Sequence, residues 1–311
     1  MRSTLRAGAI ALAASSVMLG GAAAAHAAPA DTVTVKVSKL ILEPAEAGHT
    51  GVVRIAVRNT GSEPFEGGVT ITEPIAGTLR TVEGAASVCG IDQTPDNHRI
   101  YACGLDSAIE PGATGIVKVS FRSPAQPQPF AQLAQRAGVV QVGDVTAEFP
   151  ALFRSTSGSL RTPQPYVQDA VGTLAVTAGD VTLTRQPDGT FAGRVPVTVR
   201  NNGDAAHLNL GTAITVPAGI DGWPGIEPSD ICVGIGDELP TPPGGSGLSC
   251  SLYGGQLAEG QERAFEWILT APAETVAGPL GTGTTLVQLG SRGAEQSDSA
   301  NIDTFTITIA D

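Results

Sequence analysis

Apolar and polar residues alternate with a period of two in several segments of the chain. The pattern is clear in Thr32–Val37 and again in Thr304–Ile309. Successive side chains of a strand point to opposite faces, so this alternation predicts strands with one buried face. Glycine-containing turns such as Asn59-Thr60-Gly61 separate the strands, and the chain has 39 glycines. Only Pro129–Gly138 has a composition that predicts a short helix, so the chain is expected to be all-β.

The chain also contains an internal repeat. The spacing of the matching segments grows only slightly along the chain, which indicates a duplication with few insertions. Three pairs of segments match: Gly51–Gly61 (GVVRIAVRNTG) with Gly193–Gly203 (GRVPVTVRNNG), Val69–Pro74 (VTITEP) with Thr212–Pro217 (TAITVP), and Ile116–Ala125 (IVKVSFRSPA) with Ala264–Ala273 (AFEWILTAPA).

Short alternating strands with frequent turns predict two tandem immunoglobulin-like antiparallel β-sandwich domains. We expect the first domain at residues 28–154 and the second at 166–311. The segment STSGSLRTPQP at 155–165 is rich in small residues and proline and is predicted to be a short linker. Pro196 interrupts a predicted strand, and because proline donates no hydrogen bond, we expect that strand to be an edge strand or to be bulged.

The first 27 residues have the pattern of a cleaved signal peptide. Arg2 and Arg6 precede an uncharged segment of small and apolar residues, which ends in Ala25-His26-Ala27. A basic start, an apolar middle and an A-x-A site are typical of secretory leaders. The mature protein is therefore expected to be secreted and extracellular or loosely associated with the cell wall. No transmembrane span is expected in it.

All four cysteines lie in the predicted mature part. An even number of cysteines in an exported chain predicts a disulfide framework. Each repeat contains one pair, so the repeat favours Cys89–Cys103 and Cys232–Cys250 over the other two pairings. The spacings do not fit a zinc site.

Several of these features occur together in known modules. The VRNTG and VRNNG segments, the TITEP and AITVP strands that follow, the paired cysteines and the Gly112 and Gly260 turns form one recurring pattern. This pattern resembles the immunoglobulin-like modules of bacterial surface and secreted proteins, the DUF11-like and CARDB-like modules. The resemblance covers both domains. It implies an immunoglobulin-like fold and a role as spacer, adhesin stalk or accessory domain.

Charge and catalytic motifs exclude several functions. The chain has a formal net charge of −12, and no basic cluster occurs, so a nucleic-acid partner is not expected. No G-x-S-x-G motif occurs. His49, His98 and His207 are not shared between the repeats and are predicted to lie in surface loops. We therefore expect no enzyme activity and no cofactor.

One acidic segment surrounds Cys232. Clustered carboxylates bind calcium, but proline and glycine separate these acids and no D-x-D-x-D-G loop occurs. A solvated acidic loop is therefore expected here, with a calcium site as the alternative. The acidic residues are Asp221, Glu227, Asp230, Asp237 and Glu238.

Exposed aromatic side chains are the other candidates for binding. Trp223 lies in the loop segment Gly222-Trp223-Pro224 and is a possible ligand-binding residue, whereas Trp267 alternates with the core face and should be buried. Tyr101 and Tyr253 flank the second cysteine of each repeat and are expected to pack against the disulfides.

Three functions follow from these observations. The first is a secreted, non-enzymatic structural or interaction protein of the cell envelope or exterior. A cell-wall polymer or an envelope or extracellular protein would be its partner. The second is a carbohydrate-binding or adhesive module that uses Trp223. The third is an enzyme with an unrecognised acidic site.

Overall fold

The computed structural model describes residues 33–221, 223–235, 239–290, 295–296 and 301–310. Within these ranges the chain is all-β, and no helix occurs that could cross a membrane. The predicted signal peptide lies outside them. The short helix predicted at Pro129–Gly138 is wrong: the segment contains strand β9 (Gln132–Ala134), whose backbone pairs with β12 and β13 instead of forming helical hydrogen bonds.

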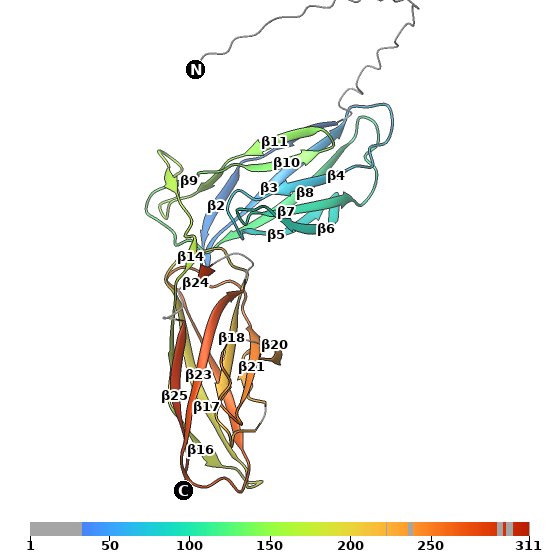
Figure 1. Cartoon of the computed structure of the whole chain (residues 1–311). Helices are drawn as coiled ribbons and strands as arrows, with labels where there is room; N and C mark the ends of the chain where they lie inside the picture. Colours follow the sequence, from blue (N-terminus) through green and yellow to red (C-terminus); the bar gives the residue numbers. More distant parts are fainter. Residues whose placement is uncertain (1–32, 222, 236–238, 291–294, 297–300, 311) are drawn as a thin grey trace, which may run out of the picture. The chain divides into compact units, whose positions relative to one another are not determined.

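Strands β1–β13 form two sheets. The larger sheet has the order β13-β9-β12-β2-β3-β8-β5, with β1 also paired to β3, and the smaller has the order β11-β10-β4-β7-β6 (Figure 1). The strands of the larger sheet are β1 (Val33–Val37), β2 (Leu40–Ala45), β3 (Gly48–Asn59), β5 (Leu79–Gly84), β8 (Thr114–Ser123), β9, β12 (Ala151–Phe153) and β13 (Gln164–Tyr166). Those of the smaller sheet are β4 (Gly68–Thr72), β6 (Ala86–Gln93), β7 (Arg99–Leu105), β10 (Gly138–Val142) and β11 (Val145–Phe149).

Ten of the remaining described strands form one sheet with the order β19-β22-β17-β16-β25-β23-β18-β21-β20, and β15 also pairs with β17. Its strands are β15 (Leu174–Ala178), β16 (Val181–Arg185), β17 (Phe191–Asn201), β18 (Asn209–Val216), β19 (Gly225–Glu227), β20 (Ser229–Gly234), β21 (Ser246–Leu252), β22 (Glu262–Ala271), β23 (Gly278–Gly290) and β25 (Ile302–Ile309). A separate parallel pair joins β14 (Val171–Gly172) to β24 (Glu295–Gln296).

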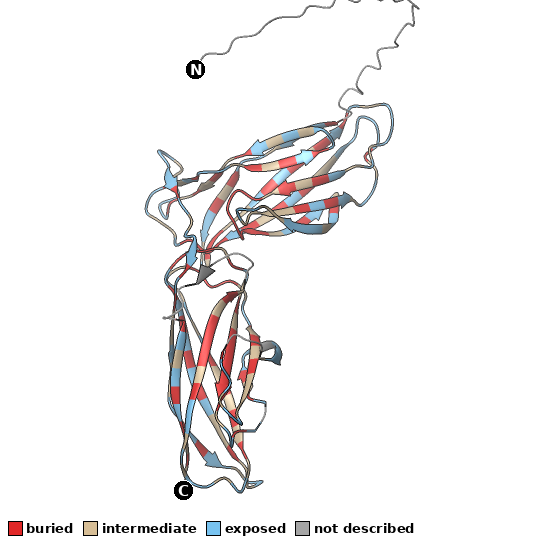
Figure 2. Ribbon diagram, in the orientation of Figure 1, coloured by how far each residue is buried: buried red, intermediate tan, exposed pale blue. Residues whose placement is uncertain are grey.

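Two large hydrophobic cores hold the described parts of these sheets together, and a small third cluster contains Ala213, Leu239 and Leu286. The first core is formed by buried side chains from the sequence range Val33–Tyr166, and the second by buried side chains from the range Leu174–Ile309. Buried and exposed residues alternate along β3 and β17, as their period-two pattern predicts (Figure 2). Burial of the apolar faces is the main driving force for this packing. The domain boundaries at 28–154, 155–165 and 166–311 stay a prediction.

The repeated asparagines Asn59 and Asn201 make equivalent hydrogen bonds. Each side chain donates to a backbone carbonyl of a distant loop, Asn59 to Ile109 at 2.7 Å and Asn201 to Leu257 at 2.8 Å. Each side-chain oxygen accepts a hydrogen bond from the backbone N–H two residues later. The backbone oxygens of Asn59 and Asn201 accept from Gly112 and Gly260, the glycines of the repeated turn. The sequence similarity thus corresponds to one shared hydrogen-bonding arrangement.

The expectation for Pro196 is confirmed in part. Strand β17 as a whole is an inner strand and is not bulged, because it pairs with β22 in unbroken register from Phe191 to Arg200. On its other side β15 and β16 pair with β17 only on either side of Pro196, so the strand has a local edge there. The Pro196 carbonyl accepts a hydrogen bond from Gly179, just after β15 ends. The nitrogen and carbonyl of one strand residue point to the same side, so the missing donor faces the break between β15 and β16. No hydrogen bond to β22 is lost.

Candidate functional site

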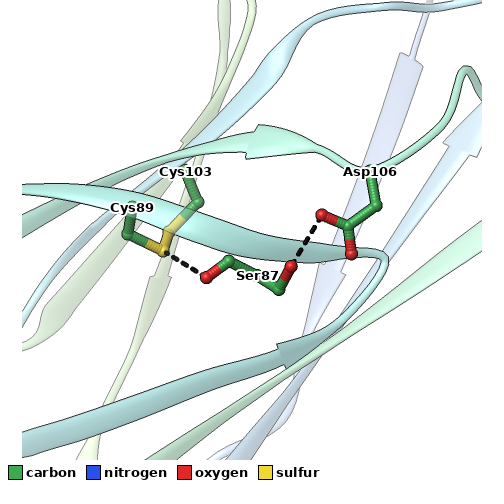
Figure 3. Close-up of a disulfide and its surroundings, with 4 residues drawn as sticks. All are labelled: Ser87, Cys89, Cys103 and Asp106. Carbon is green, nitrogen blue, oxygen red and sulfur yellow. Dashed lines mark hydrogen bonds between the residues drawn. A yellow bond between two sulfur atoms is a disulfide. The ribbon is translucent and has the colours of Figure 1, made fainter.

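The structure contains two disulfides, each between directly paired residues of neighbouring strands. Cys89 of β6 is bonded to Cys103 of β7, and Cys232 of β20 is bonded to Cys250 of β21, as the repeat predicts. Figure 3 shows the first, with the Cys89 sulfur near the Ser87 carbonyl and the Ser87 hydroxyl donating to Asp106 at 2.8 Å. Each bond joins an edge strand to its neighbour, since β6 and β20 end the orders of their sheets.

Exposed apolar side chains lie on edge strand β20 and in the loop that precedes β19. Trp223 has 69% of its surface exposed, Ile231 68% and Val233 58%. The Trp223 ring reaches the end of the strand, with its Cη2 atom 3.9 Å from the position that a Cβ on Gly234 would occupy. We call Trp223, Ile231 and Val233 the β20 surface. Successive side chains of a strand point to opposite faces, so Trp223 lies on the Gly234 face of β20 and Ile231 and Val233 lie on the other face. Exposed apolar side chains on both faces of an edge strand make that edge a candidate interaction site.

The sequence identified only one member of the β20 surface. Trp223 is exposed in a loop, as expected. Ile231 and Val233 were missed because apolar residues at alternate positions usually mark the buried face of a strand. Here the strand lies at the edge of the sheet, and its paired residues Leu248, Cys250 and Leu252 belong to the core while Ile231 and Val233 are exposed. No signal in the sequence distinguishes such a strand from a core strand.

The acidic residues around Cys232 do not form a metal site within the described residues. Glu227 is paired with Arg194 at 2.6 Å, and Arg194 also contacts Glu266 at 2.8 Å. Asp221 is exposed in the loop before Trp223. The side chain of Asp230 and the residues Asp237 and Glu238 lie outside the described residues.

Two of the three histidines in the predicted mature part are buried, so the prediction of surface-loop histidines is wrong for His49 and His207. His49 lies in β3, bonds to the Ala125 carbonyl at 3.0 Å and meets the ring of Phe153 edge to face. His207 Nδ1 donates to the Ala205 carbonyl at 2.8 Å, and its Nε2 accepts from Leu257 at 3.1 Å. Burial lowers the pKa of both imidazoles, which favours the neutral form.

His98 is half-buried and lies near a carboxylate. Its Nδ1 bonds to the Glu73 carbonyl at 3.0 Å, and its Nε2 lies 3.7 Å from Asp96. Arg136 also pairs with Asp96. These contacts hold the loop that contains His98 through polar interactions.

The aromatic residues near the core follow the predictions in part. Trp267 is fully buried, and its Nε1 donates to the Thr285 hydroxyl at 3.0 Å. Tyr101 is buried in the first core. Tyr253 is largely exposed, and its packing against the disulfide stays a prediction. It directly follows β21, where the chain leaves the sheet.

No family model matches the sequence, and no curated protein matches it. Among solved structures, a Streptococcus agalactiae AgI/II polypeptide BspA C-terminal domain is 8% identical, with 89% of this chain and 99% of that chain covered and a TM-score of 0.26. The Yersinia pseudotuberculosis adhesin InvE is 11% identical, covers 89% of this chain and 58% of its own, and has a TM-score of 0.24. A Porphyromonas gingivalis W83 protein of unknown function is 12% identical, covers 90% and 99%, and has a TM-score of 0.22.

These neighbours include bacterial adhesin and surface-protein domains. At this level of similarity they do not indicate the function of this chain. The function is therefore inferred from the residues of the chain itself.

Proposed function

We propose that the protein is a non-enzymatic interaction protein that acts outside the cell or at its envelope, and that it contacts a protein partner through the β20 surface. The carrying observation is the exposure of Ile231 and Val233 on edge strand β20 and of Trp223 in the preceding loop, whose ring reaches the end of that strand. Trp is enriched at binding hot spots because it buries a large area on contact. Two disulfides and the predicted signal peptide support an extracellular location.

The edge position of β20 indicates the form of the partner. Among the described strands β20 pairs only with β21, so its other edge offers backbone donors and acceptors. An extended segment of another protein can add to such an edge, with its apolar side chains against Ile231 and Val233. The resemblance to DUF11-like and CARDB-like modules of bacterial surface proteins supports the same role.

Carbohydrate binding through Trp223 is the second candidate. An exposed indole offers a flat apolar face against which a sugar ring can stack. This candidate requires Trp223 alone, whereas the protein-partner proposal also requires Ile231 and Val233.

Co-sedimentation of the purified mature protein with cell-wall preparations from its source tests both the protein-partner proposal and the carbohydrate candidate. One portion of the wall is treated with protease and another is left intact. We expect binding to intact wall, loss of binding after protease treatment, and loss of binding in Trp223→Ala and Ile231→Lys. Val276→Lys changes an exposed apolar residue that lies far from this strand in the sequence and serves as the control.

Retained binding to protease-treated wall that is lost in Trp223→Ala alone would replace the protein partner with a glycan. Binding that neither variant changes would overturn the role of the β20 surface. Repeating the assay with calcium and with chelator tests the acidic segment, and chelator-sensitive binding would support the calcium alternative.

A further inference from the structure

A cavity of about 560 Å³ lies beside β5, β6 and β7, away from the β20 surface. This volume is within the range of small-ligand sites. Two arginines, Arg80 and Arg99, line it together with Tyr101, Ile91 and Leu208. The cavity therefore combines positive charge with apolar walls in a protein whose formal net charge is −12.

Within the described part of the chain, no carboxylate forms an ion pair with Arg80. Its Nη2 donates to the Gln256 side-chain oxygen at 2.7 Å, which is a neutral acceptor. Its Nη1 is enclosed and has no hydrogen-bond partner among the described residues. Burial, and then the positive charge of Arg99, lower the pKa of Arg80 to about 10. The group is thus still cationic at neutral pH, and a buried cation without a partner is unfavourable.

The nearby acid Glu73 does not supply the missing partner. Its two oxygens accept hydrogen bonds from the backbone N–H groups of four residues, at 2.7 to 2.9 Å. These donors are Gly77, Thr78, Leu79 and Arg99. Its carboxylate is therefore occupied in holding the turn before β5.

Among the described residues, Arg99 also forms no ion pair. Its Nη1 donates to the Leu79 carbonyl at 3.3 Å. Among the described residues, the carboxylate that lines the cavity is that of the exposed Asp92, whose Oδ1 accepts from the Gln93 backbone. Two guanidinium groups thus share one cavity, and their mutual repulsion would be relieved by an anion.

We propose that this cavity binds a carboxylate attached to an apolar group. Arg99 and Arg80 would face the carboxylate, because a planar guanidinium matches a carboxylate in shape and charge. The apolar part would pack against Ile91, Leu208 and Tyr101. The nearby Asp92 disfavours a doubly charged anion such as phosphate more than a singly charged carboxylate. The site does not involve Trp223, so it stands independently of the proposed function.

The same chemistry is found in free organic acids and in the last residue of a peptide chain. Isothermal titration of the mature protein with octanoate and with N-acetyl-leucine distinguishes the two sources. The matched neutral probes are octanol and N-acetyl-leucinamide. We expect each bound carboxylate to bind at least about tenfold more tightly than its neutral analogue, since the charged hydrogen bonds are lost in the analogue.

Edge strand β6 offers a matched pair of variants. Ile91 is 65% exposed and lines the cavity, whereas Val88 is 79% exposed on the same strand and does not line it. Ile91→Asp places a negative charge beside the arginines and should weaken octanoate binding at least about tenfold, whereas Val88→Asp should leave it unchanged. Both sites are exposed, so neither variant should impair folding. Arg99→Gln removes one guanidinium and should weaken binding in the same way.

Tighter binding of N-acetyl-leucine than of octanoate would support the proposal with a chain end as the source, and the reverse order would support it with a free acid. Equal binding of octanoate and octanol would overturn it, as would equal binding by the Ile91→Asp and Val88→Asp variants. Failure of every carboxylate probe to bind, or tighter binding of inorganic phosphate, would also overturn it. Trp223→Ala should leave octanoate binding intact, so failure of this site and failure of the β20 surface are distinguishable.

Discussion

The Tyr166 hydroxyl donates a hydrogen bond of 2.6 Å to the carboxylate of Asp204, and both residues are buried. The other Asp204 oxygen accepts from the Asp169 backbone at 2.8 Å. Burial raises the pKa of Asp204 to about 6 from 3.8, although these hydrogen bonds oppose the shift. The same burial, with the negative charge of Asp204, raises the pKa of Tyr166.

This carboxyl group makes stability depend on pH. Asp204 keeps its proton up to about pH 6 in the folded state but only up to about pH 4 in the unfolded state. Between these pH values the folded state therefore binds more protons. Stability from Asp204 is therefore highest at low pH and decreases as pH rises through this window. The full difference is about 3 kcal/mol, from about 1.4 kcal/mol for each unit of pKa shift.

We expect Asp204→Asn to remove this dependence. Urea denaturation of the wild type and the variant at several pH values between 4 and 7.5 measures it. His49 and His207, whose pKa values are lowered by burial, change stability in the opposite direction, so the quantity to compare is the difference between the two proteins. Glu274→Gln alters an exposed acid and should keep the wild-type profile. Parallel profiles for wild type and Asp204→Asn would contradict the prediction.

The disulfides should each contribute to stability. Cys89 and Cys103 are 14 residues apart, and Cys232 and Cys250 are 18 apart. Loops of this length lose about 3 kcal/mol of chain entropy in the unfolded state when closed. Replacing either pair with serine should lower the free energy of unfolding by roughly that amount. Peptide mapping without reductant should recover both pairs, and a bond between Cys89 or Cys103 and either other cysteine would refute the pairing.

The repeated asparagines should be essential to the loops that they hold. Asn59→Ala leaves the carbonyls of Glu63 and Ile109 without the side-chain donor that now bonds to both at 2.7 Å. Such losses cost about 1 to 3 kcal/mol for each buried group. Asn201→Ala removes one donor bond, to Leu257, and should cost less. The exposed neighbour Asn202 is the matched control, and an Asn202→Ala variant as unstable as Asn201→Ala would argue against this explanation.

The two tryptophans should differ in fluorescence. Trp267 is fully buried and hydrogen-bonded to Thr285, whereas Trp223 is mostly exposed. Trp223→Phe should leave an emission at shorter wavelength that acrylamide hardly quenches. Trp267→Phe should leave a readily quenched emission at longer wavelength and should lower stability by about 1 to 3 kcal/mol, because the ring volume and one hydrogen bond are lost. Similar quenching of both variants would contradict the placement of Trp223.

The sequence by itself determined the strands, the repeat and the burial of one face. The alternation in β3 and β17 predicted which side chains enter the cores, because the period of a strand leaves only two faces to choose between. It also indicated the cysteine pairs and the exposure of Trp223. These features can be predicted because they depend on the order of residues within one segment or on the comparison of one repeat with the other.

Only the tertiary structure decided which strands lie at an edge and which charges are compensated. Pro196 proved compatible with an inner strand because a partner strand ends opposite it, and Ile231 and Val233 are exposed because β20 has a neighbour on one side. Arg80 and Arg99 lie 19 positions apart, and their shared cavity depends on how β5 and β7 are placed. Such features arise from contacts between distant segments, and the hydrophobic pattern of one segment holds no information about them.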